Sequence, residues 1–203
     1  MSKSQKRKGL IFVVSGPSGS GKTTLAKRLL SDKSLRNKLV KSVSWTTRPK
    51  RSGERRGKDY FFVSQKQFAE ARKARNLLEW TEYLGYYYAT PGDFIDGQIK
   101  KSKNVILCLD LKGALTLKRL YPHNAVTIFI MPPSLGALLE RMTKRCRKTK
   151  GAEVRQRLKL AQGEVKAASR YDYCLVNKDL RQAVRQLKDI ILEEIAGLKT
   201  RKG

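Results

Sequence analysis

The sequence Gly16-Pro-Ser-Gly-Ser-Gly-Lys-Thr-Thr24 decides the fold. It follows residues 10–14, Leu-Ile-Phe-Val-Val, an apolar run typical of a strand buried on both faces. A helical pattern with Leu25, Leu29 and Leu30 on one side comes directly after it. A glycine-rich loop between a strand and a helix, with the spacing G-x-x-x-x-G-K-T, predicts a phosphate-binding P-loop. The alternative is a glycine-rich turn that carries a surface lysine.

This loop is predicted to bind a nucleoside triphosphate together with its metal ion. Lys22 is expected to reach the β- and γ-phosphates, and the Thr23 hydroxyl is expected to ligate Mg²⁺. The predicted triphosphate-binding residues are Gly16, Pro17, Ser18, Gly19, Ser20, Gly21, Lys22, Thr23 and Thr24. Because P-loops occur in GTPases, ATPase motors and kinases, the loop alone does not define a reaction.

Further apolar runs alternate with helical patterns along the chain. The runs are residues 104–110, 125–130 and 173–176. The last helix is indicated by the apolar positions Leu180, Val184, Leu187, Ile191 and Ile195. This alternation predicts an α/β fold with a central parallel sheet covered by helices on both faces, and ligands at the carboxyl ends of its strands. Asp110 lies at such an end, whereas residues 31–41 are expected to be a polar connection.

The charge of the chain favours anionic ligands. Lys and Arg number 45 against 17 Asp and Glu, a net charge of +28. The basic residues are spread over the whole chain, and no nucleic-acid-binding motif accompanies them. Small phosphorylated molecules are therefore favoured as partners, with specific nucleic-acid binding as the weaker alternative.

Composition also favours a soluble cytoplasmic protein. A chain of 203 residues can bury one sizeable core, and no apolar run approaches the roughly 20 residues of a membrane span. The apolar run after the basic N-terminus is too short for a signal peptide. Cys108, Cys146 and Cys174 are widely spaced and predict neither a disulfide framework nor a zinc site.

Two polar, basic stretches interrupt the α/β pattern. Residues 42–92 combine short strand-like runs, one helical pattern from Gln65 to about Asn76 and an arginine-rich loop, which predicts a small insert. Residues 141–150 are almost wholly cationic and are typical of a mobile flap. An insert that holds an acceptor and a flap that closes over it favour phosphoryl transfer to a small molecule.

The insert resembles the GMP-binding region of the guanylate kinase family. The matching motifs are Ser44-Trp-Thr-Thr-Arg48, Gly53-Glu54, Gly57-Lys-Asp-Tyr60 and Tyr87-Tyr88-Ala-Thr90. The resemblance extends from about Leu10 to Ile195 and implies one P-loop kinase domain over residues 1–203. Its parts would be a core of 10–41, 93–135 and 170–197, a GMP-binding insert of 42–92 and a mobile lid of 136–169. The implied reaction is Mg²⁺-dependent transfer of the γ-phosphoryl group of ATP to GMP, and to dGMP.

The resemblance also assigns the acceptor-binding residues. The GMP phosphate would be held by Arg48, Arg51, Tyr60 and Tyr88. Guanine N1–H and its 2-amino group would donate to Glu79 and Asp110. This pair of acceptors would reject adenine, because adenine N1 carries no proton. Guanine O6 would accept from Ser44 and Thr90. Without the resemblance, Arg48 and Arg51 suit a solvated basic turn, Glu79 a surface carboxylate and Asp110 a helix cap.

The remaining assignments concern the donor and the group in transfer. Charge on the phosphoryl group would be stabilised by Lys22, Arg141, Arg145 and Arg157. Asn177 would contact the adenine of ATP, although a lone asparagine after a strand also suits a turn. Thr23 is the predicted metal ligand, and Arg147, Lys148 and Lys150 are expected to be exposed.

The sequence departs from the family pattern at five positions, one of which is Thr90, where relatives can have serine. Cys108 stands where an acidic residue is usual, Ala89 where glycine is usual and Lys112 where a neutral amide is common, while Cys146 interrupts the flap. A neutral thiol cannot replace a carboxylate near Mg²⁺. Such departures would lower the rate or loosen substrate choice, but they leave the phosphate ligands intact.

Two other functions fit parts of the sequence. A kinase for another phosphorylated acceptor, such as ribose 1,5-bisphosphate, would not need the base-binding set of Glu79, Ser44 and Thr90. A guanylate-kinase-like protein-binding module would not need an intact P-loop. Both features favour the nucleotide kinase, as a monomer or weak homodimer.

Overall fold

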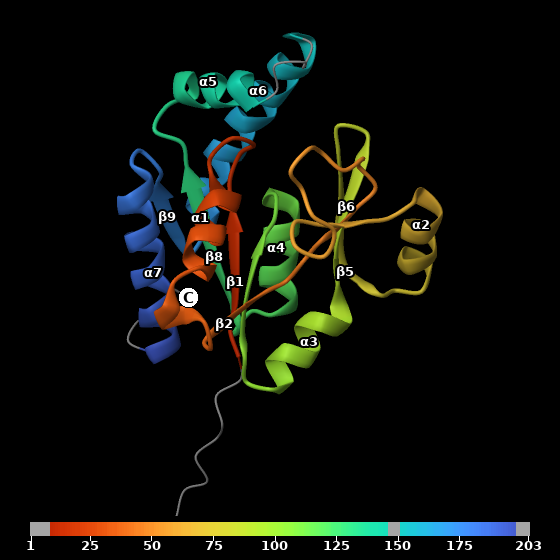
Figure 1. Cartoon of the computed structure of the whole chain (residues 1–203), viewed down its shortest axis with the longest axis vertical. Coiled ribbons are helices and arrows are strands. Elements are labelled where there is room, and N and C mark those ends of the chain that lie inside the picture. The colour runs from red at the N-terminus through yellow and green to blue at the C-terminus, as the bar shows by residue number, and fades with distance from the viewer. Residues whose placement is uncertain (1–8, 146–150, 198–203) are drawn as a thin grey trace, which may run out of the picture.

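The structure of the protein is a computed structural model, and it describes residues 9–145 and 151–197. Within them lie a five-stranded sheet, a separate four-stranded sheet and the helices around them (Figure 1). In chain order the elements are β1 (Ile11–Ser15), α1 (Lys22–Leu30), η1 (Lys33–Leu35), β2 (Leu39–Lys41), β3 (Trp45–Thr46), β4 (Phe61–Phe62), α2 (Gln65–Lys73), β5 (Leu77–Tyr83), β6 (Tyr86–Pro91), α3 (Gly92–Lys100), β7 (Asn104–Cys108), α4 (Leu111–Leu120), β8 (Ala125–Met131), α5 (Leu135–Arg145), α6 (Gly151–Lys166), η2 (Ala167–Arg170), β9 (Tyr173–Val176) and α7 (Leu180–Ala196).

The central sheet is parallel throughout, in the order β2-β7-β1-β8-β9. Alternate residues of β1 enter two cores: Phe12 and Val14 pack with α1 and α7, whereas Ile11 and Val13 pack with α3 and α4. Figure 1 shows these helix pairs on opposite faces of the sheet. The predicted α/β fold with helices on both faces is confirmed.

The prediction that residues 31–41 form a polar connection is wrong for the last three of these residues. Leu39–Lys41 form β2, an edge strand that pairs with β7, and only Leu39 of the three is fully buried. An edge strand this short contains too few apolar positions to be identified from the sequence. Helix α3 was likewise not predicted, because its apolar positions are few between Pro91 and Lys103.

The second sheet is built from residues 45–91, in the order β4-β3-β6-β5. Strand β3 pairs parallel with β4 and antiparallel with β6, which also pairs antiparallel with β5. Helix α2 covers this sheet through Phe68, whose ring stacks on Tyr87 with 4.8 Å between centroids. Ser64 and Gln67 form a capping box that starts the helix. The insert is therefore a small α/β layer beside the central sheet (Figure 1).

Helices α5 and α6 pack on each other near the P-loop. Leu138 and Met142 of α5 and Ala161 of α6 form a small buried cluster of their own. A Cβ placed on Gly19 of the P-loop would lie 3.2 Å from Leu138 Cδ1, so α5 contacts the loop directly.

No helix among the residues described is long and apolar enough to cross a membrane. Cys108 and Cys174 are free thiols. Cys146, Arg147, Lys148 and Lys150 lie outside the described residues.

Candidate active site

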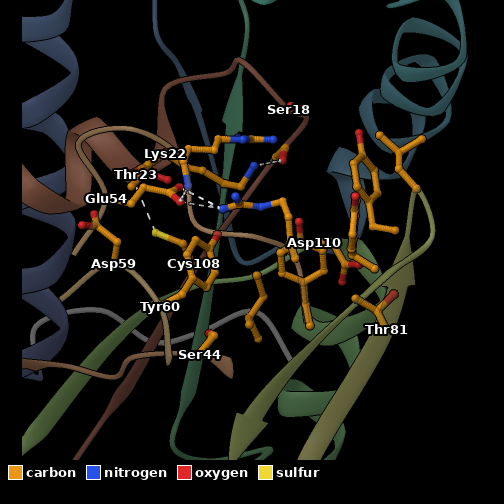
Figure 2. Close-up of a pocket in the computed structure, with 18 of the residues that line it drawn as sticks. Ser18, Lys22, Thr23, Ser44, Glu54, Asp59, Tyr60, Thr81, Cys108 and Asp110 are labelled. Carbon is orange, nitrogen blue, oxygen red and sulfur yellow. Dashed lines mark hydrogen bonds and ion pairs between the residues drawn. The ribbon is translucent and has the colours of Figure 1, made fainter. Parts of the chain in front are cut away.

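A cavity of about 890 Å³ lies at the carboxyl ends of β1 and β7 (Figure 2). Its walls come from the P-loop and α1, the four-stranded sheet, the start of α4, and α6. The sequence-predicted site residues that line it are Gly16, Ser18, Gly19, Gly21, Lys22, Thr23, Thr24, Ser44, Arg48, Arg51, Tyr60, Glu79, Tyr88, Asp110 and Arg157. The segments predicted to hold the donor and the acceptor therefore face one common space.

The P-loop glycines are required by backbone geometry. Gly16, Gly19 and Gly21 have φ of 139°, 89° and 94°, in the region that only glycine adopts readily. Helix α1 starts directly after Gly21 without a side-chain cap, so its first N–H groups point toward the cavity side of the loop. Lys22 Nζ donates to the carbonyls of Gly16 at 2.8 Å and Pro17 at 3.3 Å. The lysine thus lies along the loop that would carry phosphate.

Asn177 braces the P-loop from the end of β9. Its Nδ2 donates to the Ser20 carbonyl at 2.8 Å, and a Cβ on Gly21 would lie only 2.3 Å from that nitrogen. Arg141 of α5 donates to the Asn177 carbonyl at 3.1 Å. Pro17, Ser20 and Asn177 are buried, and none of them lies on the cavity wall; nor does Arg141.

Arg48 is buried, with 7 % of its surface exposed, and is bound by a carboxylate. Its Nη2 donates to both oxygens of Glu54, at 2.9 and 3.0 Å, and its guanidinium carbon lies 5.7 Å from the Tyr60 ring centroid. Glu54 also accepts from the backbone N–H of Arg51 at 2.9 Å. Burial acts to lower the pKa of Arg48, but Glu54 and Tyr88 raise it above its usual value, so the guanidinium stays charged. Glu54 belongs to one of the motifs that resemble the family, but no role was predicted for it.

Glu79 is the most deeply buried carboxylate on the cavity wall, with 6 % exposed. Its Oε1 accepts from Thr90 Oγ1 at 2.5 Å across the β5–β6 pair. Burial raises the pKa of Glu79 to about 7; Asp110 adds to the rise, while the Thr90 hydrogen bond and Lys112 oppose it. Thr90 is fully buried behind this carboxylate and is not on the cavity wall, whereas Ser44 is.

The oxygen donors near the P-loop suit a magnesium ion. Thr23 is exposed in the first turn of α1, and Asp110 caps α4 by accepting from the Gly113 N–H at 2.8 Å. Mg²⁺ takes one or two protein oxygens and completes its shell with phosphate and water, so the Thr23 hydroxyl fits it. Burial raises the pKa of the Cys108 thiol, against the opposing charges of Lys22 and Lys41, and a neutral thiol does not fit. Among the described residues, no cluster of acidic, histidine or cysteine side chains could hold a metal unaided.

The structure adds cavity residues that the sequence analysis did not single out. Asp59 pairs with Lys27 of α1 at 2.5 Å, and Lys41 of β2 donates to the Lys58 carbonyl. These contacts tie the insert loop to the central domain. Asp59 belongs to one of the motifs that resemble the family, and this motif could have indicated its place in the site. No feature of the sequence indicated that Lys27 and Lys41 line the cavity.

The helices beyond the P-loop contribute unequally to the cavity. Arg157 and Glu164 of α6 line it, and burial raises the pKa of Glu164 while Lys22 lowers it. Arg141 reaches Asn177 instead, and the side chain of Arg145 lies outside the part of the chain that the structure describes.

A triphosphate-binding loop that shares a cavity with a second pocket of arginines, phenols and carboxylates defines a P-loop phosphotransferase. The chain belongs to the guanylate kinase family, because the family model for guanylate kinase matches residues 8–194. Guanylate kinase of Wolbachia pipientis wMel is 39% identical over 189 residues, which are 93% of this chain and 92% of that protein. Guanylate kinase of Thermotoga maritima is 42% identical over 189 residues, which are 93% of this chain and 89% of that protein.

A solved structure supports the same assignment. The crystal structure of guanylate kinase from Anaplasma phagocytophilum matches with a TM-score of 0.75 and 32% sequence identity, over 93% of this chain and 87% of that one. The resemblance identified from the sequence motifs is therefore confirmed.

Proposed function

We infer that this protein is an ATP:GMP phosphotransferase, which transfers the γ-phosphoryl group of ATP to GMP and gives ADP and GDP. The observation that carries this function is the shared cavity, where the P-loop faces Arg48, Tyr60 and Glu79. Its residues offer cations for two phosphorylated ligands and a buried carboxylate for a base. We propose dGMP as a second acceptor.

We propose that Arg48, Arg51, Tyr60 and Tyr88 bind the GMP phosphate. All four line the cavity, and burial raises the pKa of Tyr60 to about 12, so its phenol keeps the proton that it would donate. Two guanidinium groups and two phenols together suit a phosphate dianion. Since Glu54 holds Arg48 in this structure, GMP would share that guanidinium with Glu54 or displace it.

Guanine would be selected by the carboxylates and hydroxyls at the other end of the acceptor pocket. Glu79 and Asp110 would accept from N1–H and the 2-amino group, and Ser44 and Thr90 would donate to O6. Thr90 donates to Glu79 in this structure, so its part in binding O6 requires that hydroxyl to turn. Otherwise Thr90 acts by holding Glu79.

The transfer itself needs positioning and charge stabilisation. An oxygen of the GMP phosphate attacks the γ-phosphorus as the bond from that phosphorus to the bridging oxygen of ADP breaks, and ADP leaves with the electron pair. We propose that Lys22, Arg145 and Arg157 stabilise the developing charge. Arg141 would join them only by leaving the Asn177 carbonyl to which it donates in this structure. Thr23 would hold Mg²⁺, which when bound neutralises the phosphate oxygens of ATP.

The parts of the chain take separate tasks in this proposal. Residues 42–92 would be the acceptor-binding insert and residues 136–169 the lid, on a core of 10–41, 93–135 and 170–197. Asn177 would position adenine through the P-loop that it braces. We place the reaction in the cytoplasm, since Cys108 and Cys174 are free thiols and these persist in reducing compartments.

A panel of nucleoside monophosphates tests the function. ADP formation from ATP is followed in a coupled assay with GMP, dGMP, AMP, CMP and UMP, each with and without Mg²⁺. GMP should give the highest kcat/KM, and only with Mg²⁺ present. If ADP forms no faster with GMP than with the other nucleotides, the proposed activity is wrong.

A further inference from the structure

An ion pair joins the acceptor insert to helix α1. Asp59 of the insert has a side chain that is 9 % exposed, and its Oδ1 lies 2.5 Å from Lys27 Nζ. Its other carboxylate oxygen accepts from the Arg55 backbone N–H at 2.8 Å, and the Asp59 N–H donates to the Arg55 carbonyl at 2.9 Å. The carboxylate is therefore already fixed by its own loop, so pairing with Lys27 costs little further ordering of Asp59.

Lys27 lies one helical turn after Thr23, the predicted metal ligand. Residues four apart share one face of a helix, and both of these residues line the cavity. Asp59 lines the cavity as well (Figure 2). The ion pair therefore attaches the insert to the face of α1 that carries a predicted ligand of the donor side.

Asp59 directly precedes Tyr60, which belongs to the proposed pocket for the GMP phosphate. The Tyr60 ring centroid lies 5.7 Å from the guanidinium carbon of Arg48 and 5.9 Å from the Tyr88 ring centroid. Arg48 is in turn bound by Glu54 of the same insert. Contacts inside the insert thus build the phosphate pocket, whereas Asp59 makes the contact with α1.

The same loop also contacts the edge of the central sheet. Lys41 at the end of β2 donates to the Lys58 carbonyl, next to Asp59 in the chain. The loop is therefore held from both α1 and β2. These contacts determine where the phosphate pocket lies relative to the P-loop.

We propose that Lys27 and Asp59 are positioning residues for phosphoryl transfer: their ion pair holds the acceptor phosphate pocket at the distance from Thr23 and the P-loop that the reaction needs. This inference rests on the proposed GMP kinase activity. Transfer requires the acceptor oxygen and the γ-phosphorus to be in line and close together. A displaced loop therefore slows transfer without removing any group that binds GMP.

The test compares Lys27→Met and Asp59→Asn, singly and together. Methionine keeps an apolar stem, and asparagine keeps an oxygen for the Arg55 N–H. Arg28→Met is the matched control, because Arg28 is exposed at the next position of the same helix and this variant removes the same charge. For each protein we would measure kcat, KM for both nucleotides, direct GMP binding and the melting temperature.

Each single variant should lower kcat about threefold to fivefold, the effect of losing an ion pair with one exposed partner. The dissociation constant for GMP should stay within about 1.5-fold of the wild type, since the pocket that binds its phosphate is intact. The double variant should be no slower than the single variants, because both changes remove the same interaction. Lys27→Arg, which keeps the charge of the pair, and Arg28→Met should match the wild type.

Other outcomes are distinct. A wild-type kcat in both single variants overturns the inference. A double variant whose loss is the product of the two single losses also overturns it, because Lys27 and Asp59 then act separately. Weaker GMP binding with a lower melting temperature, at an unchanged kcat, would indicate a purely structural pair. A wild-type protein that does not phosphorylate GMP contradicts the proposed function, and the inference falls with it.

Discussion

At the scale of single residues, Glu79 links selectivity to stability. Burial raises its pKa from the ordinary 4.5 of an exposed glutamate to about 7 in the folded protein, because the native carboxylate has lost water. Between these values the native state binds more protons than the unfolded state, so the contribution of Glu79 to stability falls as pH rises through this window. Glu79 thus destabilises the free enzyme at the pH where it selects guanine.

Replacing Glu79 by Gln should therefore stabilise the protein at high pH. At about pH 8 the variant should have a free energy of unfolding higher by on the order of 2 to 4 kcal/mol, and the difference should vanish below about pH 4.5. Urea unfolding at a series of pH values measures this. Glu82→Gln, at an exposed position on the same strand, is the control and should change little. Equal stability of Glu79→Gln and wild type at pH 8 would refute the assigned cause.

Lys22 is expected to act in transfer rather than in GMP binding. Lys22→Ala should lower kcat by about two to three orders of magnitude with a modest effect on the affinity for GMP, because the removed charge serves the phosphoryl group. Steady-state kinetics and direct GMP binding separate the two effects. Arg28→Ala, at an exposed position on the same helix, should be close to wild type. An unchanged kcat in Lys22→Ala would exclude the role.

Cys108 offers a test of the missing carboxylate. Figure 2 shows it beside Lys22, and its thiol donates to the Lys22 carbonyl at 3.8 Å. Cys108→Asp should raise activity or lower the Mg²⁺ concentration needed for half-maximal rate, since an oxygen anion suits this ion and Lys22 and Lys41 favour its ionisation. Cys174→Asp, on an exposed part of β9, is the control. If titration with Mg²⁺ gives the same curve for both variants, Thr23 and water suffice to hold the ion.

The site was predictable where a residue type has one chemical use in one motif. Lys22 and Thr23 follow from the P-loop spacing, and Arg48 and Glu79 from the family motifs, and all four line the cavity. The partners of these residues were not predictable, because they depend on distances between distant segments. Nothing in the sequence indicates that Glu54 binds Arg48 or that Lys112 lies over Trp80.

At the scale of elements, the long buried strands were predictable from the sequence and the strands of two or three residues were not. The runs that became β1, β7 and β8 are apolar along nearly their whole length, which is what burial on both faces requires. Strands β2, β3 and β4 span two or three residues and are set by pairing with neighbours rather than by their own pattern. Their bounds therefore depend on tertiary structure.

The P-loop and the end of β9 form one interlocked element. Gly21→Ala places a Cβ at 2.3 Å from Asn177 Nδ2 at a φ of 94°, so the Asn177 side chain or the loop must shift and the bond from Asn177 to Ser20 is weakened. A loss of about 2 kcal/mol or more in the free energy of unfolding is expected, together with loss of ATP binding. Thermal or urea unfolding and nucleotide binding measure both.

Gly97→Ala is the matched control for that substitution. Gly97 lies inside α3, and its added Cβ would meet nothing within 4 Å. This change should stabilise the protein by about 0.5 to 1 kcal/mol, since alanine is the better helix former. If both variants respond alike, the close packing of Asn177 on Gly21 is not what constrains the loop.

At the scale of the whole molecule, the net charge of +28 should oppose folding through self-repulsion. Raising the concentration of sodium chloride from about 50 mM to about 500 mM should therefore raise the melting temperature, because the screening length shortens to a few ångströms. The comparison is repeated with Lys22→Ala, which weakens anion binding at the P-loop. A melting temperature that falls with salt in both proteins would show that attractive ion pairs outweigh the repulsion.

The hydrogen bond from Asn177 to Ser20 also determines when the P-loop can be completed during synthesis of the chain. The ribosome delivers the P-loop among its first residues, but β1 lies at the centre of a sheet whose neighbours β7 and β8 are made much later, and Asn177 later still. A growing chain therefore carries an unfinished nucleotide loop until nearly all of it has emerged. Fragments that end before residue 177 lack this brace, so the P-loop reaches its braced form only after residues 42–92 have been made.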